Sequence, residues 1–100
     1  MVVLLSHNGM DVDLKLAGRV TGIDVILGGH THDAIPQPIP VGNAGGTTLV
    51  TNAGSSGKFL GVLDLEIAKG RVSDVRYRLL PVFSELLKPD AAMVALIENM

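Results

Sequence analysis

The 100-residue sequence contains no cysteine and no tryptophan, and only three aromatic residues in all. Without cysteine there is no zinc–thiolate site, no disulfide framework and no cysteine nucleophile. Two Phe and one Tyr are too few to form the stacking platforms that bind single-stranded nucleic acid. Basic residues are also scarce, since eight Lys and Arg against ten Asp and Glu give a formal charge of −2. We therefore exclude thiol chemistry and nucleic-acid binding from the expected functions.

Long hydrophobic runs are missing as well, because no apolar stretch approaches the roughly 18 residues needed to cross a bilayer. The chain is nevertheless 47% hydrophobic and 18% charged, so it can bury a core and is not of a disordered class. Its length suits one small domain or part of a larger one. The chain opens on a strand of buried type and ends within a predicted helix. We therefore expect it to be a piece of a longer protein.

The first third of the chain predicts a βαβ unit. The apolar run Val2–Leu5 is typical of a strand covered on both faces. A short helix follows, with Asp11 as the expected N-cap and Gly22 as the residue that ends it. Ile23–Leu27 is a second strand of buried type. Because a helix links the two strands, they should be parallel with a right-handed crossover.

The remainder predicts strands, loops and one more helix. Alternate prolines make residues 35–40 an extended loop, since proline fixes φ and removes an amide donor. Strands are expected at 47–51, 59–67 and 72–82, and the last two should form an antiparallel hairpin. Pro89 and Asp90 indicate the start of a C-terminal helix. The predicted fold class is α/β (α+β): a βαβ unit, a hairpin and a closing helix.

Three histidines, His7, His30 and His32, all follow predicted parallel strands. Ligands bind at the carboxyl edge of such sheets, and imidazole is the commonest metal ligand. A structural role is the more frequent one for a lone histidine such as His7. Three histidines at one edge of the sheet favour a metal site instead. We expect His30 and His32 to reach one site, or two neighbouring ions, from the same side of an extended segment, with Gly28 and Gly29 allowing close backbone approach.

Other polar residues near these histidines leave alternatives open. Asp33 could orient a ligating histidine or be an exposed loop acid. Asn8 could contact a substrate oxygen or only shape its turn. For Asp11, helix capping is the better interpretation. Residues 54–58 lack the spacing of a P-loop, although Lys58 could serve an anionic site. Three imidazoles without a committed carboxylate are an incomplete set for a two-metal hydrolytic site.

Two stretches resemble a known family. Ser-His-Asn-Gly at residues 6–9 and Gly-Ile-Asp-Val-Ile-Leu-Gly-Gly-His-Thr-His at 22–32 are similar to the later half of the calcineurin-like metallophosphoesterase domain, in its 5′-nucleotidase branch. Within that branch, residues 6–17 and 51–61 resemble the SoxB thiosulfohydrolase family. The similarity runs over essentially all 100 residues. It implies part of a four-layer αββα sandwich.

The resemblance also implies a site and a reaction. His7 and His30 would bind one metal ion and His32 the other, and the two divalent ions would be Mn²⁺, as is usual in SoxB. The implied reaction is metal-assisted hydrolysis of a cysteine S-thiosulfonate, which releases sulfate, on a SoxYZ-type sulfur-carrier protein in the periplasm. Residues 1–86 would be the trailing half of the catalytic domain. Residues 87–100 would begin a linker helix.

Two other functions remain open. The first is a 5′-nucleotidase or cyclic-nucleotide phosphodiesterase of the same superfamily. The second is a non-catalytic fragment that associates with another copy through exposed strand edges. The early motifs of the family, with their bridging aspartate, are missing from this sequence. We therefore expect the chain alone to be inactive and to hold one metal ion or none.

Overall fold

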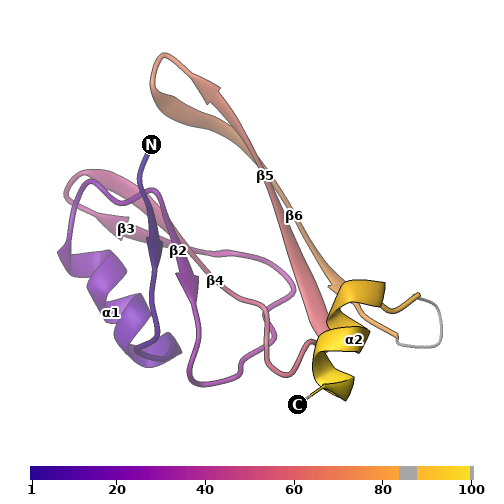
Figure 1. Cartoon of the computed structure of the whole chain (residues 1–100). Helices are drawn as coiled ribbons and strands as arrows, with labels where there is room; N and C mark the ends of the chain where they lie inside the picture. Colours follow the sequence, from indigo (N-terminus) through magenta and orange to yellow (C-terminus); the bar gives the residue numbers. More distant parts are fainter. Residues whose placement is uncertain (84–87, 100) are drawn as a thin grey trace.

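The computed structural model describes residues 1–83 and 88–99, which form six strands and two helices (Figure 1). In chain order these are β1 (Val3–Leu5), α1 (Met10–Arg19), β2 (Val25–Gly28), β3 (Ile39–Asn43), β4 (Gly46–Asn52), β5 (Phe59–Ala68), β6 (Arg71–Pro81) and α2 (Ala91–Glu98).

A four-stranded sheet has the strand order β1-β2-β4-β3. Its first three strands are parallel, and β3 pairs with β4 in the antiparallel sense. Val3 pairs with Val25, and Val25 pairs in turn with Leu49. The predicted βαβ unit is therefore confirmed, and the mixed α/β class with it.

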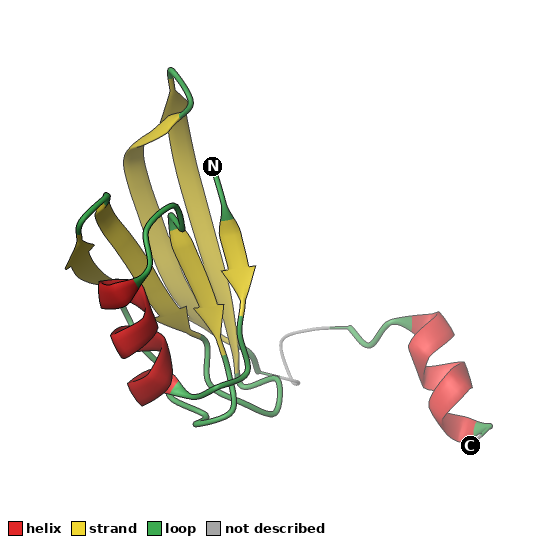
Figure 2. Ribbon diagram, turned by 90° about the vertical axis from the view of Figure 1, so that its left-hand side faces the viewer, coloured by secondary structure: helices red, strands yellow, loops and turns green. Residues whose placement is uncertain are grey.

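Helix α1 covers one face of this sheet (Figure 2). Met10 and Ala17, seven positions apart on one side of the helix, pack against Ile26 and Val50. Both of these strand residues are fully buried. At the far end of the helix, the Asn43 side chain donates to the Ala17 carbonyl oxygen at 2.9 Å, which ties α1 to β3.

The β5–β6 hairpin lies along the other face of the sheet (Figure 2). A hollow of about 380 Å³ between the two layers is lined by Leu27, Leu63 and Tyr77, among others. Gly61 makes room for Tyr77, because a Cβ at Gly61 would lie 2.9 Å from the phenolic oxygen. Burial raises the pKa of the Tyr77 phenol. The resulting order is helix, sheet, sheet.

The start of α1 differs from the prediction. Asp11 is not the N-cap. Gly9 occupies that position with φ 94°, and no side chain caps the helix there. Asp11 and Asp13 both lie in the first turn, where the helix dipole favours a carboxylate. Gly22 does adopt a left-handed backbone (φ 87°), although the helix has already ended at Arg19.

Two strands also depart from expectation. β1 was predicted to be covered on both faces, but Val3 is 41% and Leu5 78% exposed. Among the described residues, β1 is an edge strand with one partner, β2. Pro40 was predicted to lie in a loop but belongs to β3. An edge strand accommodates proline because its outward side needs no amide donor.

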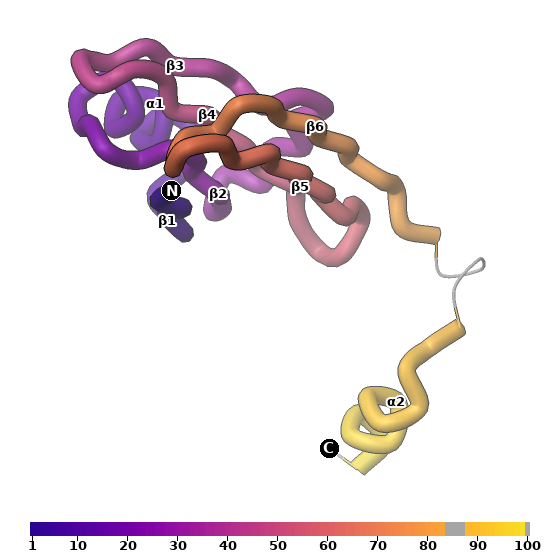
Figure 3. The backbone as a smooth tube through the Cα atoms, turned by 90° about the horizontal axis from the view of Figure 1, so that it is seen from above, coloured from indigo at the N-terminus to yellow at the C-terminus, as the bar shows by residue number. Residues whose placement is uncertain are grey.

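Helix α2 begins where the sequence predicts, because the Asp90 side chain accepts the Met93 amide at 2.9 Å. It stands apart from both sheets (Figure 3), and Met93, Leu96 and Ile97 are each more than half exposed. The predicted boundary between residues 86 and 87 lies outside the described residues. No helix in the described parts of the chain is long and apolar enough to span a membrane.

Replacing Ile26 with valine tests the core. Ile26 is fully buried, so removing one methylene should lower the free energy of unfolding by about 0.5–1.5 kcal/mol. The matched change Ile67→Val, at a position 49% exposed, should stay within about 0.5 kcal/mol. Urea unfolding followed by circular dichroism measures both. Equal losses would contradict a core centred on Ile26.

Candidate metal centre

The carboxyl ends of the three parallel strands meet at one edge of the sheet. His7 follows β1, His30 follows β2, and Asn52 is the last residue of β4. The Ser6 amide donates to the Leu27 carbonyl oxygen at 3.0 Å, which extends the β1–β2 pairing up to His7. Parallel pairing therefore brings residues 23 positions apart in the chain to the same edge.

His7 and His30 are in contact. Their ring centroids are 5.0 Å apart, with the ring planes at 67°. Two imidazoles that bind one ion through nitrogens about 2.0–2.1 Å from it, at an angle of about 90–109°, have centroids about 4.5–5.2 Å apart. A Cβ at Gly29 would lie 3.4 Å from the His7 Nδ1 atom, so Gly29 lies directly beside this ring. The separation of the pair suits a shared divalent ion.

His32 does not complete a cluster with these two rings. Within residues 1–83 and 88–99, no group of three His, Cys, Asp or Glu side chains lies close enough to hold one ion. The extended segment assumed for His-x-His is wrong, because His30 (φ 79°) and His32 (φ 60°) both have a left-handed backbone. In that conformation the side chains do not alternate as in a strand. The donor set present fits one ion with two protein ligands.

The left-handed residues belong to a loop that is held in place at Thr31. The Thr31 hydroxyl accepts the Met10 amide at 3.1 Å and donates to Asp33 Oδ2 at 2.6 Å. The loop is thereby attached to the first turn of α1. A left-handed backbone at a non-glycine residue costs of order 1 kcal/mol and persists only where the surroundings impose it. Such strain clusters at functional sites, and here it falls on two of the three histidines.

The other candidate residues are exposed and bond mainly to neighbouring residues of their own loops. Asn8 donates from Nδ2 to the Ser6 hydroxyl oxygen at 3.1 Å. Asp33 accepts from Thr31, and its carbonyl oxygen accepts the Gly54 amide at 2.8 Å. Asp33 therefore orients the histidine loop and joins it to the loop after β4. Lys58 is exposed, and its amide bonds to the Ser55 carbonyl oxygen in an ordinary turn.

The burial of two polar residues at this edge was not expected from the sequence. Asp13 is fully buried and accepts a hydrogen bond from the Ser6 hydroxyl at 2.6 Å. Asn52 is 1% exposed, and its Oδ1 accepts the Gly54 amide at 3.2 Å. Helical spacing contained a signal for Asp13, because it lies on the same side of α1 as Met10 and Ala17.

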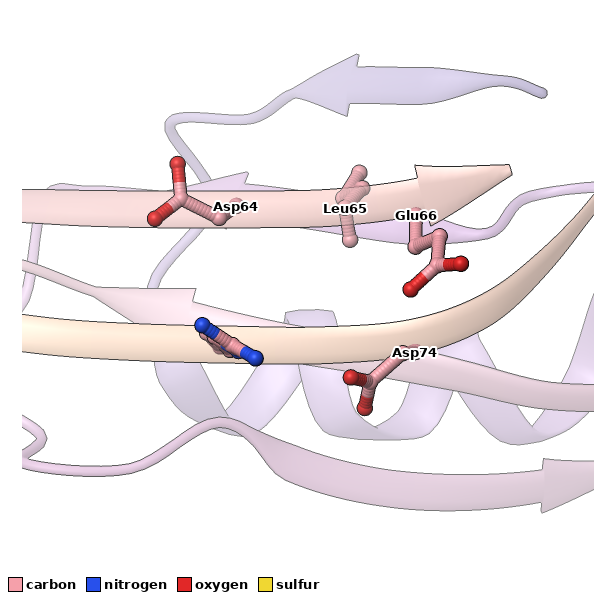
Figure 4. A pocket seen from close by; sticks show the side chains of 5 residues that line it. Asp64, Leu65, Glu66 and Asp74 are labelled. Carbon is pink, nitrogen blue, oxygen red and sulfur yellow. The ribbon is translucent and has the colours of Figure 1, made fainter.

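A second polar pocket lies on the exposed side of the hairpin (Figure 4). Asp64 pairs across the strands with Arg76, and Glu66 with Asp74. All four are exposed. The carboxylates lie far along the chain from the histidines, and among the described residues they do not group closely enough to hold an ion. The histidine edge is the better candidate site.

Solved structures resemble the whole chain. The sulfate thiohydrolase SoxB of Thermus thermophilus, in complex with glycerol, is 46% identical with a TM-score of 0.82, over 98% of this chain and 17% of that one. A 5′-nucleotidase precursor from Thermus thermophilus is 34% identical with a TM-score of 0.81, over 96% of this chain and 22% of that one.

Curated proteins of similar sequence are consistent with these structural similarities. The trifunctional nucleotide phosphoesterase YfkN of Bacillus subtilis is 42% identical over 64 residues, which are 64% of this chain and 4% of that protein. The 5′-nucleotidase of Diplobatis ommata is 32% identical over 85 residues, covering 71% of this chain and 15% of that protein. The chain thus spans less than a quarter of each of these four proteins. No family model matches.

Replacing Gly9 with alanine tests whether the histidine loop is held against α1. Gly9 has φ 94°, and a Cβ there would lie 2.7 Å from Thr31 Cγ2. The substitution should lower the free energy of unfolding by more than about 1 kcal/mol. Gly22→Ala has the same kind of backbone (φ 87°) but its Cβ would meet nothing within 4 Å, so it should lower the free energy of unfolding less than Gly9→Ala does. Indistinguishable variants in urea unfolding would contradict the contact.

Proposed function

The chain belongs to the 5′-nucleotidase branch of the metallophosphoesterase superfamily, and from this premise we propose that it carries histidine ligands of a SoxB-like, dinuclear-metal hydrolase. The observation that carries the proposal is the contact of His7 with His30 at the strand-end edge. Imidazole pairs at this separation suit a divalent ion.

His7 and His30 would hold one ion, and His32 would contribute to the second. Gly29 lies beside the His7 ring, whereas Gly28 lies against Asp13. Thr31 and Asp33 hold the loop that presents the histidines, through the bonds at 3.1 and 2.6 Å. When bound, a divalent ion polarises substrate oxygens and activates water near neutral pH.

The substrate we propose is a cysteine S-thiosulfonate on a sulfur-carrier protein, with sulfate as the product. Support comes from identity: 46% with SoxB over 98% of the chain, against 34% with the 5′-nucleotidase precursor over 96%. Manganese as the resident ion and a SoxYZ-type carrier as the partner are part of the same proposal.

Hydrolysis of nucleotides is the second candidate. The curated relatives favour it, because the matches in Bacillus subtilis and Diplobatis ommata are a nucleotide phosphoesterase and a 5′-nucleotidase. Both candidates use the same metal centre and differ in the group that is hydrolysed. The choice between them therefore depends on the substrate and not on the histidines.

The ligand set limits what the chain does by itself. Two imidazoles in contact leave most positions around a divalent ion to water. No carboxylate in the described residues joins them. We therefore propose that the chain binds one ion weakly and does not turn over substrate at the rate of an intact enzyme.

Loss of either contacting histidine should abolish this binding. In calorimetric titrations with Mn²⁺, His7→Ala and His30→Ala should each weaken affinity more than tenfold, because loss of even an indirect partner costs about 10–100-fold. His32→Ala should have a smaller effect. Glu66→Gln, in the hairpin pocket, should have none. Weakening by Glu66→Gln alone would place the ion at the hairpin and contradict the proposed centre.

Exchange of segments separates the two substrates. The chain is grafted in place of the matching segment of Thermus thermophilus SoxB, and separately into the 5′-nucleotidase precursor. The SoxB graft should still hydrolyse a thiosulfonate carrier. The graft in the 5′-nucleotidase precursor should lose a larger share of its turnover of a 5′-nucleotide. The reverse ranking, with both grafts folded, would favour a nucleotidase. The ungrafted chain with Mn²⁺ is the control and should be inactive toward both substrates.

A further inference from the structure

The carboxyl group of Asp13 connects α1 with the strand ends that carry the histidines. It is fully buried, and its Oδ1 accepts the Ser6 hydroxyl at 2.6 Å. The same Ser6 oxygen accepts from Asn8 Nδ2 at 3.1 Å. Asp13, Ser6 and Asn8 therefore form one chain of hydrogen bonds, which starts inside the protein and ends at the exposed turn.

His7 lies between Ser6 and Asn8, the two residues that these hydrogen bonds restrain. The Ser6 backbone is also fixed to β2, because its amide donates to the Leu27 carbonyl oxygen at 3.0 Å. The neighbours of His7 on both sides are thus held relative to the strand that leads to His30. The restraint accounts for the 5.0 Å ring contact between an exposed turn and a strained loop.

The second carboxyl oxygen of Asp13 lies against Gly28. A Cβ at Gly28 would be 2.6 Å from Asp13 Oδ2, so only glycine leaves room for it. This oxygen is buried and accepts no hydrogen bond from any described residue. The Nδ2 atom of Asn52 is likewise buried and donates to none of them.

The unpaired acceptor and the unpaired donor are on the same side of the sheet. Asn52 is the strand partner of Gly28. By strand alternation, both occupy the face of Ile26 and Val50, which α1 covers. Asp13 and Asn52 therefore both lie on the buried side of this sheet edge, and no hydrogen bond joins them in the structure.

We propose that Asp13 is the positioning residue of the metal centre: through Ser6 it holds His7 against His30. The metal part of this statement rests on the proposed function. The ring contact does not, because it is a feature of the structure itself.

Two readouts on the full chain test the proposal. The first is the nuclear Overhauser effect between the ring protons of His7 and His30, measured without metal. Single His→Gln variants assign the ring-proton signals to each histidine. The second is affinity for Mn²⁺. Asp13→Ala and Ser6→Ala should each lose the ring contact and bind Mn²⁺ about 10–100-fold more weakly. Asp13→Asn keeps an oxygen for Ser6, so it should retain the ring contact.

Asp11→Ala is the matched control. Asp11 lies in the same helical turn but is exposed, so both readouts should be unchanged. Should Asp13→Ala fail to fold, Ser6→Ala carries the test. Folded Ser6→Ala with the ring contact intact would overturn the proposal. If the unmutated chain binds no Mn²⁺, the proposed metal function fails, while the ring contact still decides the role of Asp13.

Discussion

Backbone hydrogen bonds between β1, β2 and β4 determine where the polar residues of this protein lie. Because the three strands run in parallel, their carboxyl ends share one edge, and the residue after each strand is delivered to it. Helix α1 stabilises the arrangement by covering Ile26 and Val50, whose burial contributes about 1.5–3 kcal/mol each. The edge itself is polar. Its geometry depends on strand pairing that the buried residues under α1 stabilise.

Much of the fold follows from short-range patterns in the sequence. Two apolar runs separated by a helical stretch predicted parallel strands, and alternation around Lys69 and Gly70 predicted the hairpin. The predictions were wrong where contacts between residues far apart in the sequence determine the local structure. Nothing within Val2–Leu5 tells an edge strand from a central one. The choice of Gly9 as N-cap reflects its close approach to Thr31, which is 22 positions away.

The site was predictable in its residue types but less so in its geometry. Strand ends placed His7 and His30 together correctly, because topology alone brings them to one edge. His32 could not be placed, since the left-handed backbone at both loop histidines comes from contacts with α1 and not from a local preference. The burial of Asp13 was not expected, because a carboxylate in a first helical turn is ordinarily exposed. Its burial depends on Gly28, which leaves room for it.

The left-handed backbone at His30 and His32 restricts which residues can replace them. At each position glycine relieves the conformational penalty, and asparagine tolerates it better than most residues, but neither offers an imidazole. A β-branched residue at either position would therefore add backbone strain to the loss of the imidazole, so the loop tolerates few replacements there.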